Sequence, residues 1–232
     1  MKSAITQEVA QVDPRDVPAL YDRLARVYDV WAALAESKAR RCAFERADVT
    51  GHDDILEVAV GTGQMFAALA QANTKGTTRG IDVSPGMLTK ARRRTGGLDR
   101  RVELQLADAR ALPVDDRSFD LVVVGYLFDL LPETDFGLVI AEINRVLRDS
   151  GLVVVVDMTI AERRRDDLYR WVSRLRARLL GGCRGVRLTA CLASGGFNIE
   201  HRDYIAQCSF PSEVLLARPD QRLEATSSEE TS

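Results

Sequence analysis

The stretch that decides the fold is Asp54-Ile-Leu-Glu-Val-Ala-Val-Gly-Thr-Gly63, an apolar run that ends in two closely spaced glycines. The run reads as a buried strand, and Gly61 and Gly63 permit a sharp turn and the close approach of a ligand to the backbone. Residues 64–72 then predict a helix. In an open parallel sheet, this order places the turn at the carboxyl end of a strand, where such sheets bind ligands.

Strands and helices alternate downstream of this unit. Further strands are predicted at 77–82, 102–106, 119–124 and 152–157, and helices at 85–94 and 134–147. Several strands are apolar throughout, which is typical of a parallel sheet covered on both faces. After a helix at about 186–194, strands at 198–207 and 211–217 predict an antiparallel edge hairpin. We therefore expect an α/β fold with a doubly wound, seven-stranded, mostly parallel sheet.

Two helical segments are expected to flank or interrupt this domain. Residues 1–50 predict an N-terminal helical lid, and residues 51–218 form the ligand-binding domain, into which an arginine-rich lid helix at 161–180 is inserted. The polar residues 219–232 show no periodicity and predict a disordered tail.

Composition excludes several classes of function. The chain has 232 residues, of which 46% are hydrophobic, as in one globular domain. Its 32 basic and 34 acidic residues leave a net charge of −2, which argues against nucleic-acid binding. No apolar run approaches the roughly 20 residues of a membrane-spanning helix, and no secretion signal opens the chain, so we expect a cytoplasmic protein. Without a C-x-x-C pair, and with only 2 histidines, no metal site is expected.

The residues that follow the strands suggest a ligand. Asp82 ends the second strand, where a carboxylate can accept both hydroxyl protons of a ribose, and Asp108-Ala109 follows the third, where a carboxylate could take the exocyclic amine of adenine. Phe66 stands where a dinucleotide-binding fingerprint has its third glycine, so a pyrophosphate is disfavoured. Together these residues describe a site for an adenosine without a phosphate chain.

Five sequence segments, taken together, resemble one family. They are YDRLARVYDVW (21–31), ILEVAVGTGQ (55–64), GIDVSPGML (80–88), LADARALPVDDRSFD (106–120) and AEINRVLRDSGLVVVVD (141–157). In order and spacing they are similar to the class I S-adenosylmethionine-dependent methyltransferases, and within these to the type 11, ubiquinone/menaquinone-biosynthesis methyltransferases. The resemblance covers about residues 21–217.

The resemblance implies a cofactor, S-adenosyl-L-methionine, and a set of residues that hold it. Gly61, Thr62 and Gly63 would back the methionine moiety, and Glu57 would lie near its amino group. Gly125 and Tyr126 would face the methyl-donor end. The full implied set is Tyr28, Glu57, Gly61, Thr62, Gly63, Asp82, Met87, Asp108, Ala109, Gly125 and Tyr126.

The acceptor side is less defined. Many relatives carry two histidines before a Leu-Pro pair, but this chain has Asp129 and Leu130 there, which leaves Asp129 as the candidate catalytic base. The same carboxylate could instead cap or orient the next helix. Trp31, Phe128 and Trp171 suggest an apolar substrate pocket.

We therefore expect an enzyme that methylates a small molecule, mainly through proximity and orientation. The acceptor atom could be a thiol, a hydroxyl, a quinone ring carbon or an amine. An alternative is a phospholipid head-group N-methyltransferase, for which the arginines of 161–180 could contact an anionic membrane. Two other classes stay open: a nicotinamide-dependent oxidoreductase and a non-catalytic partner that binds the cofactor.

Overall fold

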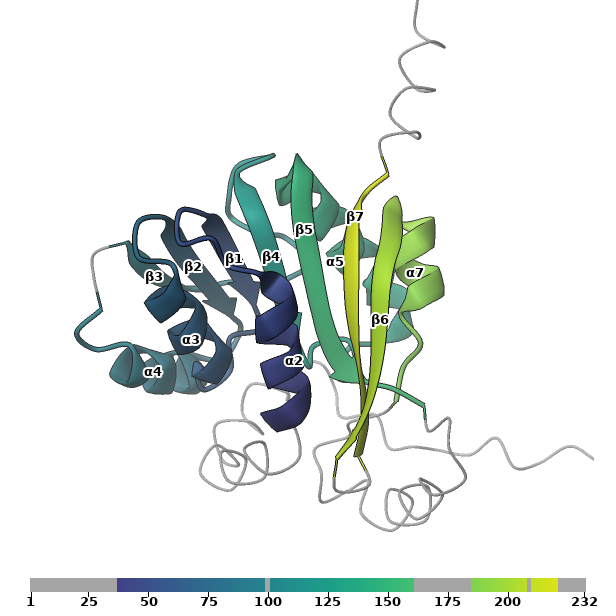
Figure 1. Ribbon diagram of the computed structural model, residues 1–232, viewed down its shortest axis with the longest axis horizontal. Coiled ribbons are helices and arrows are strands. Elements are labelled where there is room, and N and C mark those ends of the chain that lie inside the picture. The colour runs from purple at the N-terminus through teal and green to yellow at the C-terminus, as the bar shows by residue number, and fades with distance from the viewer. Residues whose placement is uncertain (1–36, 99–100, 161–184, 208–209, 221–232) are drawn as a thin grey trace, which may run out of the picture.

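Strands and helices alternate along the chain, as the sequence predicts (Figure 1). The computed structural model describes residues 37–98, 101–160, 185–207 and 210–220. The helices of this part are α2 (Ser37–Ala47), α3 (Gln64–Ala72), α4 (Pro85–Arg94), α5 (Glu133–Val146) and α7 (Thr189–Ser194). The strands are β1 (Asp54–Val58), β2 (Thr77–Asp82), β3 (Val102–Leu106), β4 (Phe119–Gly125), β5 (Leu147–Met158), β6 (Phe197–Gln207) and β7 (Phe210–Pro219).

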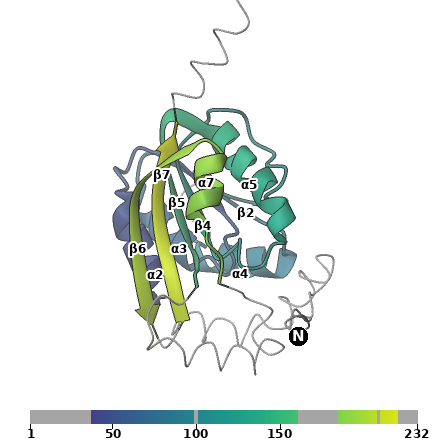
Figure 2. The same ribbon diagram turned by 90° about the vertical axis from the view of Figure 1, so that its right-hand side faces the viewer.

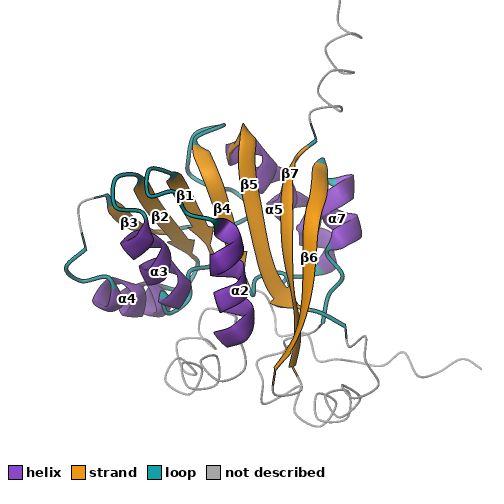
Figure 3. Cartoon of the chain, viewed as in Figure 1, coloured by secondary structure: helices purple, strands orange, loops and turns teal. Residues whose placement is uncertain are grey.

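All seven strands form one sheet in the order β3-β2-β1-β4-β5-β7-β6. The first five strands of the chain pair in parallel, whereas β7 is antiparallel to both β5 and β6. The mostly parallel sheet and its antiparallel edge hairpin are therefore confirmed. Figure 3 shows the arrowheads of β2 and β5 at the same lower edge, where the parallel strands end and their loops begin.

Some element boundaries differ from the prediction for physical reasons. β5 begins at Leu147 rather than at residue 152, because Leu147 leaves α5 directly into an extended conformation and pairs with Phe119 across a register shift. Helix α7 begins at Thr189 rather than near 186, because Val186 forms an isolated β-bridge with Thr159.

The sheet is buried between helices on both faces. Along β4, Leu121 and Val123 belong to the apolar cluster that includes residues of α2 and α3. Val122 and Val124, between and after them, belong to the cluster with α5 and α7. Figure 2 shows α5 and α7 on the face of the sheet opposite α2. A central strand with both faces covered is apolar without alternation, which explains why the sequence of β4 reads as a continuous run.

Helix α2 lies close to the sheet because its buried face is made of small side chains. Ala39, Ala43 and Ala47 are spaced by one turn of helix and are at most 5% exposed. They pack in the cluster that contains Val154 of β5 and Val214 of β7. α2 is the described part of the segment expected to be helical over residues 1–50.

The other predicted lid, at 161–180, lies outside the described residues, and so do residues 221–232 of the predicted tail, whereas Pro219 is the last residue of β7. The proposed domain boundaries at residues 50 and 218 stay predictions. In the parts of the chain that the structure describes, no helix is long and apolar enough to cross a membrane.

Phe66 fills the space between α3 and β2, and its loss should destabilise the fold. The side chain is 0% exposed, and a Cβ at Gly80 of β2 would lie 2.8 Å from its Cε2. We expect Phe66→Ala to lower the free energy of unfolding by about 3 to 5 kcal/mol, because the cavity removes both buried area and packing contacts. Urea unfolding measures the change.

Leu138→Ala is the matched control, because Leu138 lies on α5 with 55% of its surface exposed. This variant should stay within about 0.5 kcal/mol of the wild type. A loss for Phe66→Ala no larger than that of the control would contradict the packing role of Phe66.

Candidate functional site

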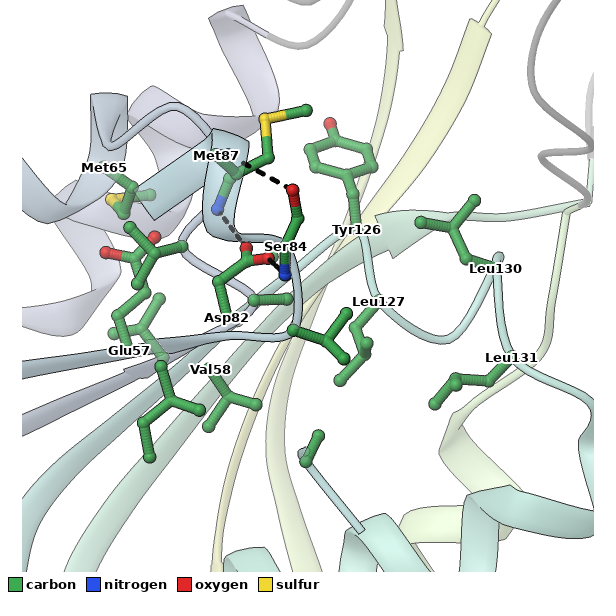
Figure 4. A pocket seen from close by; sticks show the side chains of 18 of the residues that line it. Glu57, Val58, Met65, Asp82, Ser84, Met87, Tyr126, Leu127, Leu130 and Leu131 are labelled. Atoms are coloured by element: carbon green, nitrogen blue, oxygen red, sulfur yellow. Dashed lines mark hydrogen bonds between the residues drawn. The ribbon is translucent and has the colours of Figure 1, made fainter. Parts of the chain in front are cut away.

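A pocket opens at the carboxyl ends of β1, β2 and β4, and most of the predicted cofactor residues line it (Figure 4). The predicted residues that line it are Glu57, Gly61, Thr62, Asp82, Met87, Asp108, Ala109, Gly125 and Tyr126. The structure does not describe Tyr28, nor the predicted substrate residues Trp31 and Trp171. The tertiary structure thus gathers at one place residues that end or follow β1, β2, β3 and β4.

The glycine turn after β1 positions the start of α3. Gly61 and Gly63 have φ angles of +56° and +80°, in the left-handed region that favours glycine. A Cβ on Gly63 would lie 2.8 Å from the Cα of Ala91 in α4, so this glycine permits close contact between two helices. Gly63 does not line the pocket that the described residues form, and its role behind the methionine moiety stays a prediction.

Asp82 ties the loops after β1 and β2 together. Its Oδ2 accepts a hydrogen bond from the backbone N–H of Gly61 (2.7 Å), and its Oδ1 accepts one from that of Ser84 (2.8 Å). Ser84 in turn caps α4, since its Oγ accepts a hydrogen bond from the backbone N–H of Met87 (3.2 Å; Figure 4). The carboxylate is therefore held in one orientation.

Glu57 is a buried carboxyl group with spare hydrogen-bonding capacity. It is 2% exposed, and its Oε2 makes no hydrogen bond to the described residues. Burial raises the pKa of Glu57 well above its ordinary value, and the nearby Asp82 adds to this, whereas Arg40 opposes it. An uncompensated buried acid next to a pocket is typical of functional sites.

Tyr126 and Ala59 place strained backbone at the pocket. Their φ angles are +52° and +62°, a region that side chains with a Cβ rarely adopt, and both residues line the pocket. The hydroxyl of Tyr126 lies 3.1 Å from Ser212 Oγ, and the guanidinium of Arg40 lies 5.6 Å from the centre of the Tyr126 ring. This cation–π contact brings α2 to the pocket.

Sequence reasoning missed two arginines that line the pocket, Arg40 and Arg110. Arg40 belongs to a helix that is predicted correctly, but the face that this helix turns to the sheet depends on its packing. Arg110 directly follows the predicted Asp108-Ala109 pair, so its nearness to that pair is the one signal that could have drawn attention to it.

Two predicted acceptor residues are not in the pocket. Phe128 is 0% exposed and packs edge-on against Phe136, with ring centres 5.2 Å apart, so it lies in the core and does not line the pocket that the described residues form. Asp129 is 2% exposed and faces Asp157, whose carboxyl accepts its backbone N–H (3.2 Å). Burial and the charge of Asp129 raise the pKa of Asp157. Asp129 does not line the pocket that the described residues form, and its role as the catalytic base stays a prediction.

The residues on either side of this pair form an aliphatic wall instead. Leu127, Leu130 and Leu131 line the pocket (Figure 4), and their loop is held from beneath because the backbone N–H of Phe128 donates to Asp157 Oδ2 (2.8 Å). Among the described residues, no three His, Cys, Asp or Glu side chains converge as a metal ion would require. The pocket thus has an acidic end at β1 and β2 and an apolar end after β4.

Comparisons with known proteins agree with this geometry. Residues 55–151 match the model of the methyltransferase domain family. A demethylmenaquinone methyltransferase from Lactobacillus johnsonii is 32% identical over 164 residues, which are 68% of this chain and 65% of that protein. The chain thus spans slightly less than two thirds of this curated relative.

Solved structures share the fold at lower identity. The N-methyltransferase NodS from Bradyrhizobium japonicum, in complex with S-adenosyl-L-homocysteine, has a TM-score of 0.70 at 17% identity, over 89% of this chain and 100% of that one. The [4+2]-cyclase SpnF has a TM-score of 0.71 at 20% identity, over 88% and 94%. Because one of these proteins is described as a cyclase, the fold alone does not determine the chemistry.

The burial of Glu57 has a measurable consequence for stability. Since the pKa of Glu57 is raised in the folded state, its contribution to stability is complete below the unfolded pKa and is lost as the pH rises through the folded pKa. Ligand-free Glu57→Gln lacks this loss. We expect it to equal the wild type in acid and to become the more stable protein as the pH rises, as measured by urea unfolding across a pH series.

Glu45→Gln is the control, because Glu45 lies on the exposed side of α2 with 63% of its side chain accessible. It should not change the pH dependence of unfolding. A stability difference between Glu57→Gln and wild type that is the same at every pH would refute the raised pKa.

Proposed function

We propose that the chain is a class I S-adenosylmethionine-dependent methyltransferase that methylates a largely apolar small molecule. The observation that carries the proposal is the juxtaposition, in one pocket, of the buried Glu57, the oriented Asp82 and an aliphatic wall. The first two suit the cofactor and the third suits an apolar acceptor.

The acidic end of the pocket fits the methionine part of the cofactor. An ammonium group would supply the donor and the positive charge that Glu57 Oε2 lacks. Arg40, which lines the same pocket and acts electrostatically on Glu57, would bind the carboxylate. The ammonium group of the methionine part would thus face Glu57, and its carboxylate would face Arg40.

The remaining cofactor residues have roles that follow from their positions. Asp82 would accept hydrogen bonds from the ribose hydroxyl groups, and Asp108 would accept one from the exocyclic amine of adenine. Met87, which is 3% exposed at the first turn of α4, would pack against the adenine ring. Gly61 leaves room for the ligand, because a Cβ there would meet nothing within 4 Å.

When bound, the cofactor supplies a methyl group on a sulfonium. The acceptor would bond to this methyl group by in-line displacement while the methyl–sulfur bond breaks and leaves a thioether. The protein contributes mainly by holding the reactants in line, which can account for several kcal/mol of the barrier. Tyr126, held by Ser212 and Arg40, would orient the methyl-donor end, while Leu127, Leu130 and Leu131 exclude water from the acceptor.

We propose a reduced naphthoquinone ring as the first acceptor to test. The aliphatic wall suits an apolar ring, and the curated relative is a demethylmenaquinone methyltransferase by name. A thiol, a hydroxyl compound, an amine and a phospholipid head group are the competing acceptors. The arginine-rich segment 161–180, on which membrane contact would depend, lies outside the described residues.

The two other classes of function are disfavoured by different observations. Phe66 is fully buried where a dinucleotide-binding helix would need a glycine, which argues against a nicotinamide-dependent oxidoreductase. A non-catalytic binding protein would have the same pocket, so only turnover distinguishes it from the enzyme.

The proposal is tested by binding and turnover. We expect the wild type to bind S-adenosyl-L-homocysteine in calorimetry, and Asp82→Asn to bind it about tenfold more weakly or worse, because a charge-assisted hydrogen bond is lost. With a methyl-labelled cofactor, label should pass to the quinol faster than to the other acceptors. No binding to the wild type would refute the cofactor assignment, and binding without transfer to any acceptor would support the non-catalytic alternative.

Arg40→Met tests the methionine end of the site. It should bind S-adenosyl-L-homocysteine about tenfold more weakly, because the carboxylate loses its cation, but should bind the analogue without that carboxylate almost as the wild type does. Arg41→Met is the matched control, since Arg41 is the next residue of α2, pairs with Glu45 and has 82% of its side chain exposed. Equal losses for both ligands in Arg40→Met would contradict the contact with the carboxylate.

A further inference from the structure

Arg110 grips the carboxylate that is expected to bind adenine. Its backbone N–H donates to Asp108 Oδ1 (2.9 Å), its Nε lies 3.0 and 3.1 Å from the two carboxylate oxygens, and its Nη2 donates to Oδ2 (2.6 Å). Both residues line the pocket. The carboxylate is therefore bound on two sides by one residue and has little freedom to rotate.

This grip also determines the chemical character of Asp108. The hydrogen bonds from Arg110 lower the pKa of Asp108, even though partial burial acts in the other direction. An ionised carboxylate can only accept hydrogen bonds, whereas a protonated one can also donate. Asp108 is thus kept in the form that binds a donor and repels an acceptor.

The Nη1 group of Arg110 bonds to another element. Its Nη1 donates to Asp135 Oδ2 (2.9 Å), in the first turn of α5. The backbone N–H of Asp135 is bonded to the carbonyl of Pro132 (3.0 Å), and Pro132 itself lines the pocket. Arg110 thus links the loop after β3 to the loop after β4, and both are fixed relative to each other.

We propose that Arg110 is a positioning residue that sets the selectivity of the cofactor site for adenine. It acts through Asp108, which it presents to the base as a fixed acceptor. The exocyclic amine of adenine is a donor, whereas the corresponding atom of hypoxanthine is a carbonyl oxygen and would be repelled. This inference rests on the proposed function, because it concerns the base of the same cofactor.

The planar fork of arginine is essential to this role. A guanidinium can bond to both oxygens of one carboxylate and still have a third direction for Asp135, whereas an ammonium is a point charge without that geometry. Arg110→Lys keeps the charge and loses the fork. Arg110→Met keeps much of the aliphatic stem and loses both.

The test compares two ligands, S-adenosyl-L-homocysteine and its inosine counterpart, in calorimetry with the full chain. In the wild type we expect the adenine ligand to bind at least about tenfold more tightly. In Arg110→Met and in Arg110→Lys, the preference for the adenine ligand over the inosine ligand should fall to about one third of its wild-type value or less. The main cause should be weaker binding of the adenine ligand. Arg79→Met, which removes a surface arginine paired with Glu103, should keep the wild-type ratio.

Each outcome decides the matter. If Arg110→Met bound both ligands more weakly by the same factor, Arg110 would only support the fold. If Arg110→Lys kept the wild-type ratio of affinities, charge alone would suffice. Either result overturns the proposal. Asp135→Asn should reduce the ratio less than Arg110→Met, because Asp108 keeps its partner. If the wild type bound neither ligand, the proposed function itself would fail, which is a different result from an unchanged ratio.

Discussion

The burial of Glu57 beside Asp82, at the ends of two neighbouring parallel strands, is the constraint on which the site depends. Two carboxyl groups in a poorly solvated pocket repel each other, and the charged state of the buried one is costly. Arg40 offsets part of this cost from outside the sheet. We therefore propose that an amino acid moiety completes this site, because its ammonium group suits the two carboxyl groups and its carboxylate suits Arg40.

Carboxylates near the ends of strands hold the loops around the pocket. Asp82, Asp108 and Asp157 each follow or end a strand, and each accepts backbone N–H groups from loops that line the pocket. These hydrogen bonds hold loops that no strand or helix would hold. Asp157 accepts hydrogen bonds from the backbone of the loop after β4, including the N–H of Asp129. Asp129 is therefore held beside Asp157 and does not line the pocket that the described residues form.

Much of the fold could be predicted because its signals are local. The apolar run of β4 and the turn at Gly61 identify themselves in the sequence, since a doubly covered strand and a left-handed turn each restrict the residues they accept. Asp82 and Asp108 could be placed for the same reason, as the carboxyl ends of parallel strands meet at one edge. The start of β5 was misplaced because a register shift depends on the partner strand.

Only the tertiary structure decided which side chains enter the pocket. Phe128 and Asp129 adjoin Leu127 and Leu130, yet the first pair is buried beneath the wall and the second pair forms it. The sequence by itself determined the order of strands and helices, the glycine turn and the carboxylates at the strand ends. The positions of Arg40 and Arg110 at the pocket were decided by packing, because long side chains take their direction from contacts that spacing in the sequence cannot reveal.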